Sequence, residues 1–404
     1  MRIAYLTPRV PYPPISGGRL RAHYMLQHLA RSHAVTVYAI GSHWQRSADF
    51  AIAPPSGLEQ KLFPKSLLGY GYCAFKGLFS RLPFQVKLYE SAALARALAE
   101  DVKRGQIDLL FVHLLRMADY VLPYAGVPRI LDMVDSLCLH YHRMPRIWHS
   151  PRWLATRVDR ARVCKYEAEM PGRFDSVLLA SPADLAWVRH RTQAENLVLV
   201  PNGVDLEHCS LNDVPPEPNR IIFFGKLDYL PNADAAIYFA REIFPLVKRS
   251  VPEAHLCVVG WSPPRGVRAL ARLQGVTVRA NVPDIRVEVA KSSVAVAPLR
   301  FGAGTQYKIL ESLALGVPVV ATPEPVRALL EDTAGPILIG SNPEEFADQT
   351  ARLLQDAGLR ERARRAGRLL VESRYSWDDA LAPLDRILDQ RAKPTKQCPE
   401  NPLC

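Results

Sequence analysis

Residues 300–322 combine a turn that exposes backbone N–H groups with residue types that bind phosphate. Gly302, Gly304 and Thr305 form a tight turn directly before an apolar-periodic segment at 309–314, which predicts a helix. The free N–H groups and the positive end of the dipole at the start of such a helix suit an anion. The sequence therefore indicates an anion-binding turn at this point.

Two charged side chains follow on the same predicted helix. Lys308 and Glu311 are three residues apart, so they share one face of that helix. A lysine there suits a phosphate, and a carboxylate there can accept hydrogen bonds from sugar hydroxyls. Residues 316–318 then end the helix, and 319–321 are typical of a buried strand. A glycine-capped helix without any ligand is the alternative interpretation.

This stretch resembles the nucleotide-sugar site of the family 4 glycosyltransferases. Those enzymes carry the motif G-x-G-T-x-x-K-x-L-E-x-x-A-x-G-x-P-V-V, and nearly every position of it is present from Gly302 to Val320. The resemblance implies an α/β protein with the GT-B fold, in which two Rossmann-like, doubly wound parallel-sheet domains face one another across a cleft. It also implies a retaining transferase that uses a nucleotide-diphosphate sugar as donor and needs no metal or other cofactor.

One position departs from the family pattern. Many members carry a second glutamate eight residues before the position of Glu311, where this chain has Ala303. The contact with the donor sugar that is often given to this glutamate must then come from backbone groups of residues 301–305 or from another side chain. We expect Ala303 to make the use of the donor differ from that of relatives.

The elements that position this stretch begin with a βα unit. A strand at 3–6, a proline-rich loop and a helix at 19–30 are typical of a doubly wound sheet, which binds ligands in the loops after its strands. Gly17 and Gly18 in that loop allow backbone N–H groups to approach a ligand closely. The loop resembles the family's P-x-x-G-G loop, which lies near the donor phosphates and the acceptor. A turn without a ligand is the alternative.

Two further side chains follow predicted strands at 107–112 and 129–133, the second of which also carries Asp132. A histidine at the carboxyl end of a strand can donate to a hydroxyl or phosphate, and the family often places one near the sugar, which indicates His113. Asp135 is expected to accept a hydrogen bond from the sugar-accepting molecule. A core histidine and a capping aspartate are the alternatives.

The second half of the chain repeats the strand–helix theme. A strand at 220–224 leads into Gly225 and Lys226. The family has a basic residue directly after this glycine and a second one about five residues later, and both contact the pyrophosphate. Lys226 fits the first role, whereas Asn232 stands near the second, so Lys308 is expected to carry more of the phosphate contact. Val282 lies where the family holds the nucleotide base by backbone contacts.

These patterns predict the division of the chain. The resemblance implies an acceptor domain at 1–199 and a nucleotide-sugar domain at 200–374. It also implies a helix at 375–392 that crosses back onto the first domain, because the Tyr-x-Trp pattern at 375–377 is similar to the start of that helix in the family. A polar tail at 393–404 is predicted to be disordered. The boundary follows from the sharp Pro-Asn-Gly-Val-Asp turn at 201–205 and the polar linker after it.

Composition limits the class of protein. The chain has 404 residues, a formal net charge of +11 and seven cysteines without paired spacing. No secretory signal and no run of about twenty apolar residues is present, so a cytoplasmic protein is expected. The cysteines fit a reducing compartment without a disulfide framework, and no C-x-x-C pair favours zinc. The positive charge favours an anionic partner, and nucleotide sugar or lipid is preferred over nucleic acid, for which no motif appears.

Two basic segments bear on a membrane. Residues 61–89 alternate aromatic and aliphatic residues with basic ones and contain no acid, which suits an anionic membrane surface; a helix pair packed on the sheet is the alternative. His140, His142 and His149 suggest a metal cluster, but many arginines and a lone Asp159 surround them and oppose a divalent cation. We therefore expect a basic surface and a peripheral position at the inner face of the cytoplasmic membrane.

The favoured hypothesis is a glycosyltransferase of exopolysaccharide or cell-envelope glycan synthesis. The chain also resembles exopolysaccharide transferases associated with exosortase systems, which implies a polyprenyl-linked or glycan acceptor. No dedicated protein base is expected, because the leaving diphosphate takes the acceptor proton. A nucleotide-sugar 2-epimerase of related fold and a non-catalytic nucleotide- or membrane-binding protein are the alternatives. A G-x-G-x-x-G after the first strand and a P-loop are both missing, which argues against a dehydrogenase and a kinase.

Overall fold

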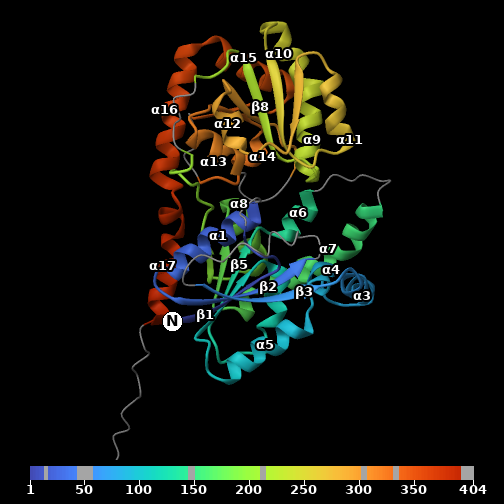
Figure 1. The fold of residues 1–404 in the computed structure, drawn as a ribbon, viewed down its shortest axis with the longest axis vertical. Coiled ribbons are helices and arrows are strands. Elements are labelled where there is room, and N and C mark those ends of the chain that lie inside the picture. The colour runs from blue at the N-terminus through green and yellow to red at the C-terminus, as the bar shows by residue number, and fades with distance from the viewer. Residues whose placement is uncertain are drawn as a thin grey trace, which may run out of the picture.

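The protein consists of two parallel β-sheets flanked by helices, as the sequence predicts (Figure 1). The computed structural model describes residues 1–12, 17–42, 58–143, 151–209, 215–301, 307–330 and 336–392. The first sheet has seven strands in the order β3-β2-β1-β4-β5-β6-β7, and the second has six in the order β10-β9-β8-β11-β12-β13. In each sheet the strand order switches direction next to the first strand of the domain, between β1 and β4 in the first sheet and between β8 and β11 in the second. Sheets of this kind bind ligands at such a switch point.

Apart from the edge strand β3, the first sheet is built mainly from short apolar strands that are buried on both faces, as is typical of parallel sheets. Its strands are β1 (Arg2–Thr7), β2 (Ala34–Ser42), β3 (Leu58–Lys65), β4 (Leu109–His113), β5 (Arg129–Val134), β6 (Ser176–Leu179) and β7 (Leu197–Leu199). Its helices are α1 (Gly17–Ala30), α3 (Leu67–Leu78), α4 (Phe84–Leu88), α5 (Ala92–Lys103), the 3-10 helix η1 (Leu115–Tyr120), α6 (Leu137–Arg143), α7 (Pro151–Glu169), the 3-10 helix η2 (Pro171–Arg173) and α8 (Pro182–Thr192).

The second sheet follows the same plan. Its strands are β8 (Arg220–Lys226), β9 (His255–Trp261), β10 (Val276–Ala280), β11 (Val294–Ala297), β12 (Val319–Ala321) and β13 (Ile337–Ile339). Its helices are α9 (Leu230–Tyr238), the π-helical η3 (Phe239–Ile243), α10 (Phe244–Ser250), α11 (Arg265–Arg268), the 3-10 helix η4 (Ala269–Arg272), α12 (Ile285–Ala290), α13 (Tyr307–Ala314), α14 (Pro323–Val326), α15 (Pro343–Gln355) and α16 (Ala357–Arg374). The predicted boundary between 199 and 200 stays a prediction; it falls where the first sheet ends.

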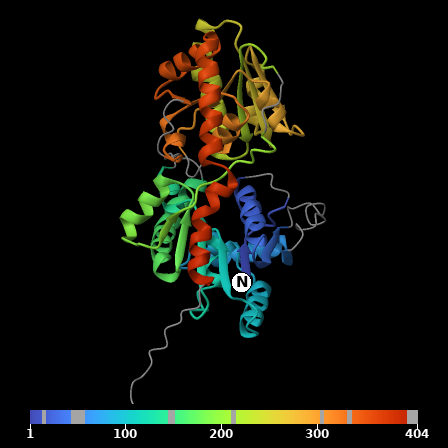
Figure 2. The ribbon, with the colours of Figure 1, turned by 90° about the vertical axis from the view of Figure 1, so that its left-hand side faces the viewer.

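The last helix, α17 (Trp377–Ala392), leaves the second domain and runs along the first (Figure 2). Trp377 stacks on Tyr24 of α1 with ring centroids 4.7 Å apart, and His28 lies 2.6 Å from Asp385. The apolar face of α17 joins the core on the α1 side of the first sheet, where Leu384 is fully buried. The chain therefore completes the first domain with its C-terminal helix.

Two elements differ from the prediction. Strand β3 pairs in parallel with β2 along its whole length, although the sequence before residue 61 gives no periodic signal. It is an edge strand with mixed side chains, so burial leaves little pattern in it. From the sequence after Asp234 we expect a helix from about Ala235 to Lys248. In the structure this helix begins at Leu230 and passes through the π-helical η3 into α10. Pro231 is tolerated there because it occupies the first turn.

Candidate active site

A buried lysine and an asparagine organise the candidate donor site on the second domain. Lys308, at the start of α13, is 7% exposed and donates from Nζ to Asn232 Oδ1 at 2.6 Å. Asn232 donates from Nδ2 to the carbonyl of Lys226 at 2.9 Å, so one side chain joins α13 to the end of β8. Gly225 has a φ of 143° and lies so close that an added Cβ would be 3.2 Å from Asn232 Nδ2. These contacts bring three of the predicted residues to one place.

The sequence analysis treated Asn232 as the loss of a phosphate contact. In the structure Asn232 holds the Lys308 ammonium group and the turn after β8 in fixed positions. Lys226 points its own half-exposed ammonium toward Asp228, at 3.6 Å. The two lysines thus flank the turn at Gly225, one buried and one exposed.

Burial changes the charge state of the site. It lowers the pKa of Lys308 to about 7, and the neighbouring Glu311 carboxylate opposes that shift. Burial also raises the pKa of Glu311 to about 7, against the attraction of Arg286 and Lys308. Both groups would regain a full charge if an ionic or hydroxyl-bearing ligand compensated for the lost solvent. Such perturbed pairs are typical of functional sites.

The other predicted residue of this domain lies farther along the sheet. Val282 is half-buried in the turn between β10 and α12, where Asp284 caps α12 by accepting from the backbone N–H of Arg286 at 2.9 Å. This turn follows the carboxyl end of an edge strand. Its exposed backbone is compatible with contact to a planar base.

The facing edge of the first domain contributes Gly17 and Gly18. Both open α1, and a Cβ added to Gly17 would be 3.2 Å from the ring of Tyr307, whereas Gly18 faces open space. Tyr307 directly precedes Lys308 on α13. Gly17 therefore lies against the residue that precedes Lys308, across the boundary between the domains.

His113 is fixed by a buried ionic network at the end of β4. Its Nδ1 lies 2.9 Å from Asp132 Oδ2, and the Asp132 carboxylate is bound by the fully buried Arg21 at 2.8 Å. Arg21 also donates to Asn202 Oδ1 at 2.9 Å. Burial would raise the pKa of Asp132, but Arg21 and His113 lower it by more, to about 2. His113 thus has one nitrogen committed to a permanent carboxylate.

Sequence reasoning missed this network. Asp132 was visible as an acid within an apolar strand, but Asp135 at the strand exit was chosen in its place. Arg21 gave no signal, because its partner lies 111 residues away. Helical periodicity alone does not distinguish a buried arginine from a solvated one.

Asp135 occupies a strained turn after β5. The preceding residue, Val134, has a φ of 69°, a left-handed conformation that β-branched residues rarely adopt. Oδ1 of Asp135 is buried without a hydrogen-bond partner among the described residues. Burial and the nearby Asp184 raise the pKa of Asp135 to about 8, although Arg21 opposes the shift. A strained turn that presents an unsatisfied carboxyl group suits ligand contact.

Comparison with known proteins identifies the domain that carries the lysines. Residues 218–356 match the sequence model of the family described as "Glycosyl transferases group 1". A curated relative, D-inositol 3-phosphate glycosyltransferase from Xylanimonas cellulosilytica, is 30% identical over 263 residues, which cover 56% of this chain and 60% of that protein. The match thus spans about three fifths of the relative.

Solved structures extend the likeness to both domains. Sucrose-phosphate synthase from Thermosynechococcus elongatus superposes with a TM-score of 0.73 at 16% identity and covers 96% of this chain and 98% of its own. HepE from Anabaena, in complex with UDP and glucose, superposes with a TM-score of 0.69 at 12% identity and covers 96% and 100%. At such identities the likeness concerns the fold, and it confirms the predicted GT-B architecture.

In the second domain, the predicted anion-binding turn is not among the described residues. Gly302, Ala303, Gly304 and Thr305 lie outside them, and the predicted tail at 393–404 does as well. Their assigned roles stay predictions. Helix α13, which follows the turn, begins at Tyr307 and buries Ile309, Leu310 and Leu313 as the periodicity predicts.

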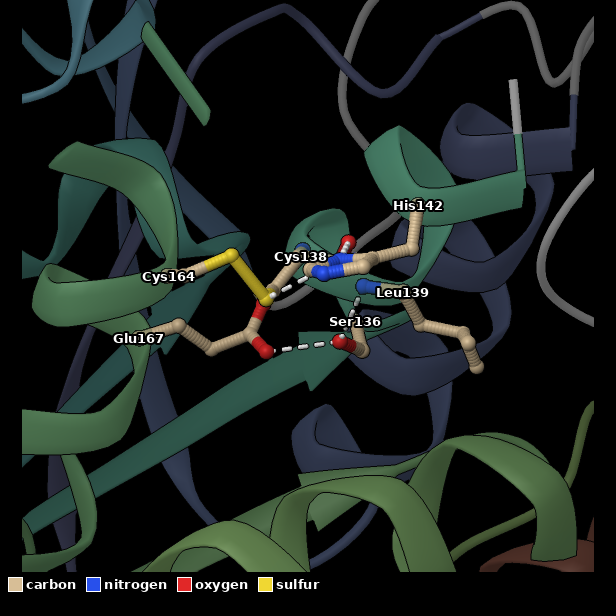
Figure 3. The surroundings of a disulfide bond; sticks show 6 residues. All are labelled: Ser136, Cys138, Leu139, His142, Cys164 and Glu167. Carbon is tan, nitrogen blue, oxygen red and sulfur yellow. Dashed lines mark hydrogen bonds between the residues drawn. A yellow bond between two sulfur atoms is a disulfide. The ribbon is translucent and has the colours of Figure 1, made fainter. Parts of the chain in front are cut away.

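The prediction that no cysteines pair is wrong. Cys138 of α6 and Cys164 of α7 form a disulfide, which lies near Ser136, the residue after Asp135 (Figure 3). The spacing gave no signal because the pair is 26 residues apart and meets only when the two helices pack. His142 Nδ1 lies 3.7 Å from Cys138 Sγ, so these three residues form a cluster of metal-ligand types whose sulfurs are bonded to each other.

Glu167 completes the support of this turn. It accepts from Ser136 Oγ at 2.6 Å and from the backbone N–H of Cys138 at 3.1 Å (Figure 3). Burial raises the pKa of Glu167 to about 7, while the bond from Ser136 opposes the shift. The disulfide and this carboxyl group together fix α6 against α7, just after Asp135.

Proposed function

We propose that this protein is a retaining glycosyltransferase that moves a sugar from a nucleotide diphosphate to a hydroxyl acceptor. The observation that carries the proposal is the buried Lys308, held by Asn232 beside Gly225 and preceded on α13 by Tyr307, whose ring lies against Gly17 of the first domain. A preorganised cation in a water-poor site stabilises charge that develops on a departing diphosphate. The match of residues 218–356 to the model of the "Glycosyl transferases group 1" supports a donor bound on this domain.

Each residue has a role in this proposal. Lys308 and the more exposed Lys226 neutralise the diphosphate as the bond to the sugar breaks. Glu311 accepts hydrogen bonds from sugar hydroxyls, and His113, oriented by Asp132, donates to the sugar or a phosphate oxygen. Asp135 binds the acceptor hydroxyl, whose proton passes to the leaving diphosphate. This assignment requires no metal and no separate protein base.

The donor nucleotide is proposed to be UDP. HepE, which shares the fold, is described in complex with UDP and glucose. Binding of UDP and GDP by the full chain, measured by calorimetry, tests this choice, and turnover with a panel of UDP- and GDP-sugars tests the activity. We expect Lys308→Gln to abolish turnover and Arg272→Gln, which removes an exposed arginine elsewhere on the same domain, to leave it unchanged. A chain that binds neither nucleotide and neither hydrolyses nor transfers any sugar would refute the proposal, and interconversion of donors without acceptor would favour an epimerase.

We further propose that the acceptor is lipid-linked or a growing polysaccharide, in exopolysaccharide or cell-envelope synthesis, and is met at an anionic membrane. Helix α3 supports the membrane contact. Its outer face carries large apolar side chains, of which Leu68 is 86% and Phe79 is 79% exposed, while Cys73 and Gly77 face inward. Exposed lysine and arginine at positions 76 and 81 lie beside that face, and the segment contains no acid. Such a face suits insertion at the boundary between headgroups and acyl chains. No helix among the described residues has the length and apolar content to span a bilayer.

Vesicle flotation tests the contact. We expect binding to vesicles that contain phosphatidylglycerol and none to neutral vesicles at the same salt concentration. The double variant Leu68→Ser and Phe75→Ser should lose binding, whereas Leu369→Ser, at an exposed leucine of α16, should retain it. Equal flotation of all three proteins would contradict the role of α3.

A further inference from the structure

Two arginines of the first domain converge on one tyrosine. Arg9 donates from Nη2 to Tyr89 Oη at 3.4 Å, and the guanidinium carbon of Arg116 lies 5.3 Å from the centroid of the Tyr89 ring. Tyr89 is itself buried, and its carbonyl accepts from Tyr120 Oη at 2.8 Å. A fixed aromatic ring thus holds two positive groups near each other.

No acid balances these charges. Among the described residues, neither Arg9 nor Arg116 has a carboxylate within ion-pair distance, and Nε of Arg116 is buried without a hydrogen-bond partner. Burial lowers the pKa of Arg116, and the charge of Arg9 lowers it further. Arg21, the fully buried arginine of the same domain, is matched by Asp132. Two neighbouring guanidinium groups, one of them partly buried, lower the stability of the fold unless a bound anion balances their charge.

The pair lies at the ligand-binding edge of the sheet. Arg9 follows β1 and Arg116 opens η1 after β4, and these two strands are neighbours in register. Leu114, which links His113 to η1, has a φ of 73° and a ψ of 139°, a conformation that is strained for any residue with a side chain. The strained link turns the chain so that His113 and Arg116 both lie at this edge.

The surroundings connect this edge to α3. Tyr89 ends α4, and its ring meets that of Tyr70, on the inner side of α3, at 6.4 Å. The pair therefore lies between the edge that faces the second domain and the helix whose outer face is apolar. A molecule whose anionic group bound there would have the second domain on one side and α3 on the other.

We propose that Arg9, Arg116 and the Tyr89 hydroxyl bind a phosphate group of the acceptor. The planar guanidinium forks suit the oxygens of a phosphate monoester or diphosphate, and the hydroxyl supplies one further donor. The inference rests on the proposed transferase function, since it names the chemical class of that function's acceptor. The phosphate belongs to an isoprenyl lipid or to a soluble phosphorylated sugar, and the experiment separates these sources.

Calorimetry on the full chain with three probes tests the site. The probes are farnesyl phosphate, farnesol and glucose 1-phosphate. We expect the phosphorylated probes to bind, and Arg9→Gln and Arg116→Gln each to weaken that binding about tenfold to a hundredfold, the usual effect of losing a charged hydrogen bond. Tighter binding of farnesyl phosphate than of glucose 1-phosphate assigns the group to a lipid, and the reverse order assigns it to a soluble acceptor.

Controls keep the outcome interpretable. Arg9 is exposed, so its variant should fold even if Arg116→Gln does not, and Tyr89→Phe removes only the hydroxyl that Arg9 contacts. Arg272→Gln removes an equal charge from the second domain and should bind the probes normally. Equal affinity of farnesol and farnesyl phosphate, or unchanged phosphate binding by Arg9→Gln, overturns the site. Failure of the wild type to bind UDP would instead count against the transferase function.

Discussion

At the scale of single residues, the candidate donor site depends on a lysine whose charge varies near neutral pH. Lys308 is buried against the ring of Phe223, 4.5 Å from its centroid, and Asn232 is its hydrogen-bond acceptor among the described residues. Its pKa near 7 means that the free protein carries a mixture of charged and neutral Lys308. An arriving diphosphate selects the charged form.

The affinity for a nucleotide sugar should therefore depend on pH. Lys308 is charged below pH 7 and neutral above it, so binding is strongest below the pKa and weakens as the pH rises through it. We expect the affinity for UDP-glucose, whose diphosphate does not titrate in this range, to be about tenfold lower at pH 8 than at pH 6. Calorimetry across this range measures the effect. Glu311 titrates in the same range, so Lys308→Arg, which stays charged, should reduce the pH dependence by the share of the lysine. An unchanged dependence in that variant would assign the effect to Glu311 or another group.

The Arg21–Asp132 pair should be costly to break. Asp132→Asn leaves a fully buried arginine without its counter-charge, and we expect a loss of about 3–5 kcal/mol in the free energy of unfolding. The matched change Asp108→Asn breaks a solvent-exposed pair with Arg2 and should cost no more than about 1 kcal/mol. Urea unfolding of both variants measures the difference. Similar small losses would show that the buried network does not stabilise the fold.

Sequence alone predicted the residues whose roles depend on local spacing. Lys308 and Glu311 share a helical face because they are three apart, and Gly225 and Lys226 follow an apolar strand. The role of Asn232 as a link between Lys226 and Lys308 was not predictable, because Asn232 and Lys308 are 76 residues apart in the sequence. The same limit applies to Arg21 and to the Arg9–Arg116 pair, since only the folded sheet brings these partners together.

At the scale of elements, the doubly wound sheets were predictable because buried parallel strands are continuous apolar runs. Strand β3 was not, since an edge strand with charged and apolar residues lacks such a run. The α6–α7 disulfide likewise depends on how two helices pack. It connects α6, which follows Asp135, to the long α7, and Arg143 at the end of α6 lies 2.6 Å from Glu324 of the second domain.

Reduction of this disulfide should lower stability. Cys138 and Cys164 are 26 residues apart, and a closed loop of that size stabilises a fold by about 3 kcal/mol in the chain-entropy account. Thermal unfolding with and without a reductant measures the change, and mass spectrometry after alkylation counts the thiols. In Cys164→Ser the reductant should have no effect. A wild type whose stability ignores the reductant would mean that the pair is not closed in solution.

At the scale of the whole molecule, α17 joins the two domains. Its Leu384 is fully buried in the core of the first domain although the preceding helix, α16, lies on the second. The prediction of a helix that crosses back came from a short Tyr-x-Trp pattern and the family resemblance. Its packing partners on α1 lie more than three hundred residues earlier, beyond the reach of any local pattern.

Truncation of that buried side chain should act on the first domain. We expect Leu384→Ala to lower its free energy of unfolding by about 2–5 kcal/mol, while UDP binding to the second domain persists. Leu369→Ala, at an exposed leucine of α16, should change stability by no more than about 0.5 kcal/mol. Calorimetric unfolding resolves the transitions of the two domains. A loss confined to the second domain would contradict the packing of α17.

The position of α17 also affects the order of events during synthesis. The first domain emerges from the ribosome early, but the helix that covers its α1 face is made only after the second domain. At typical translation rates, the residues between β7 and α17 take about 10 to 40 s to synthesise. During that time the apolar surface that later receives Trp377 and Leu384 is bare, so the nascent first domain is a ready target for chaperones until α17 has been made.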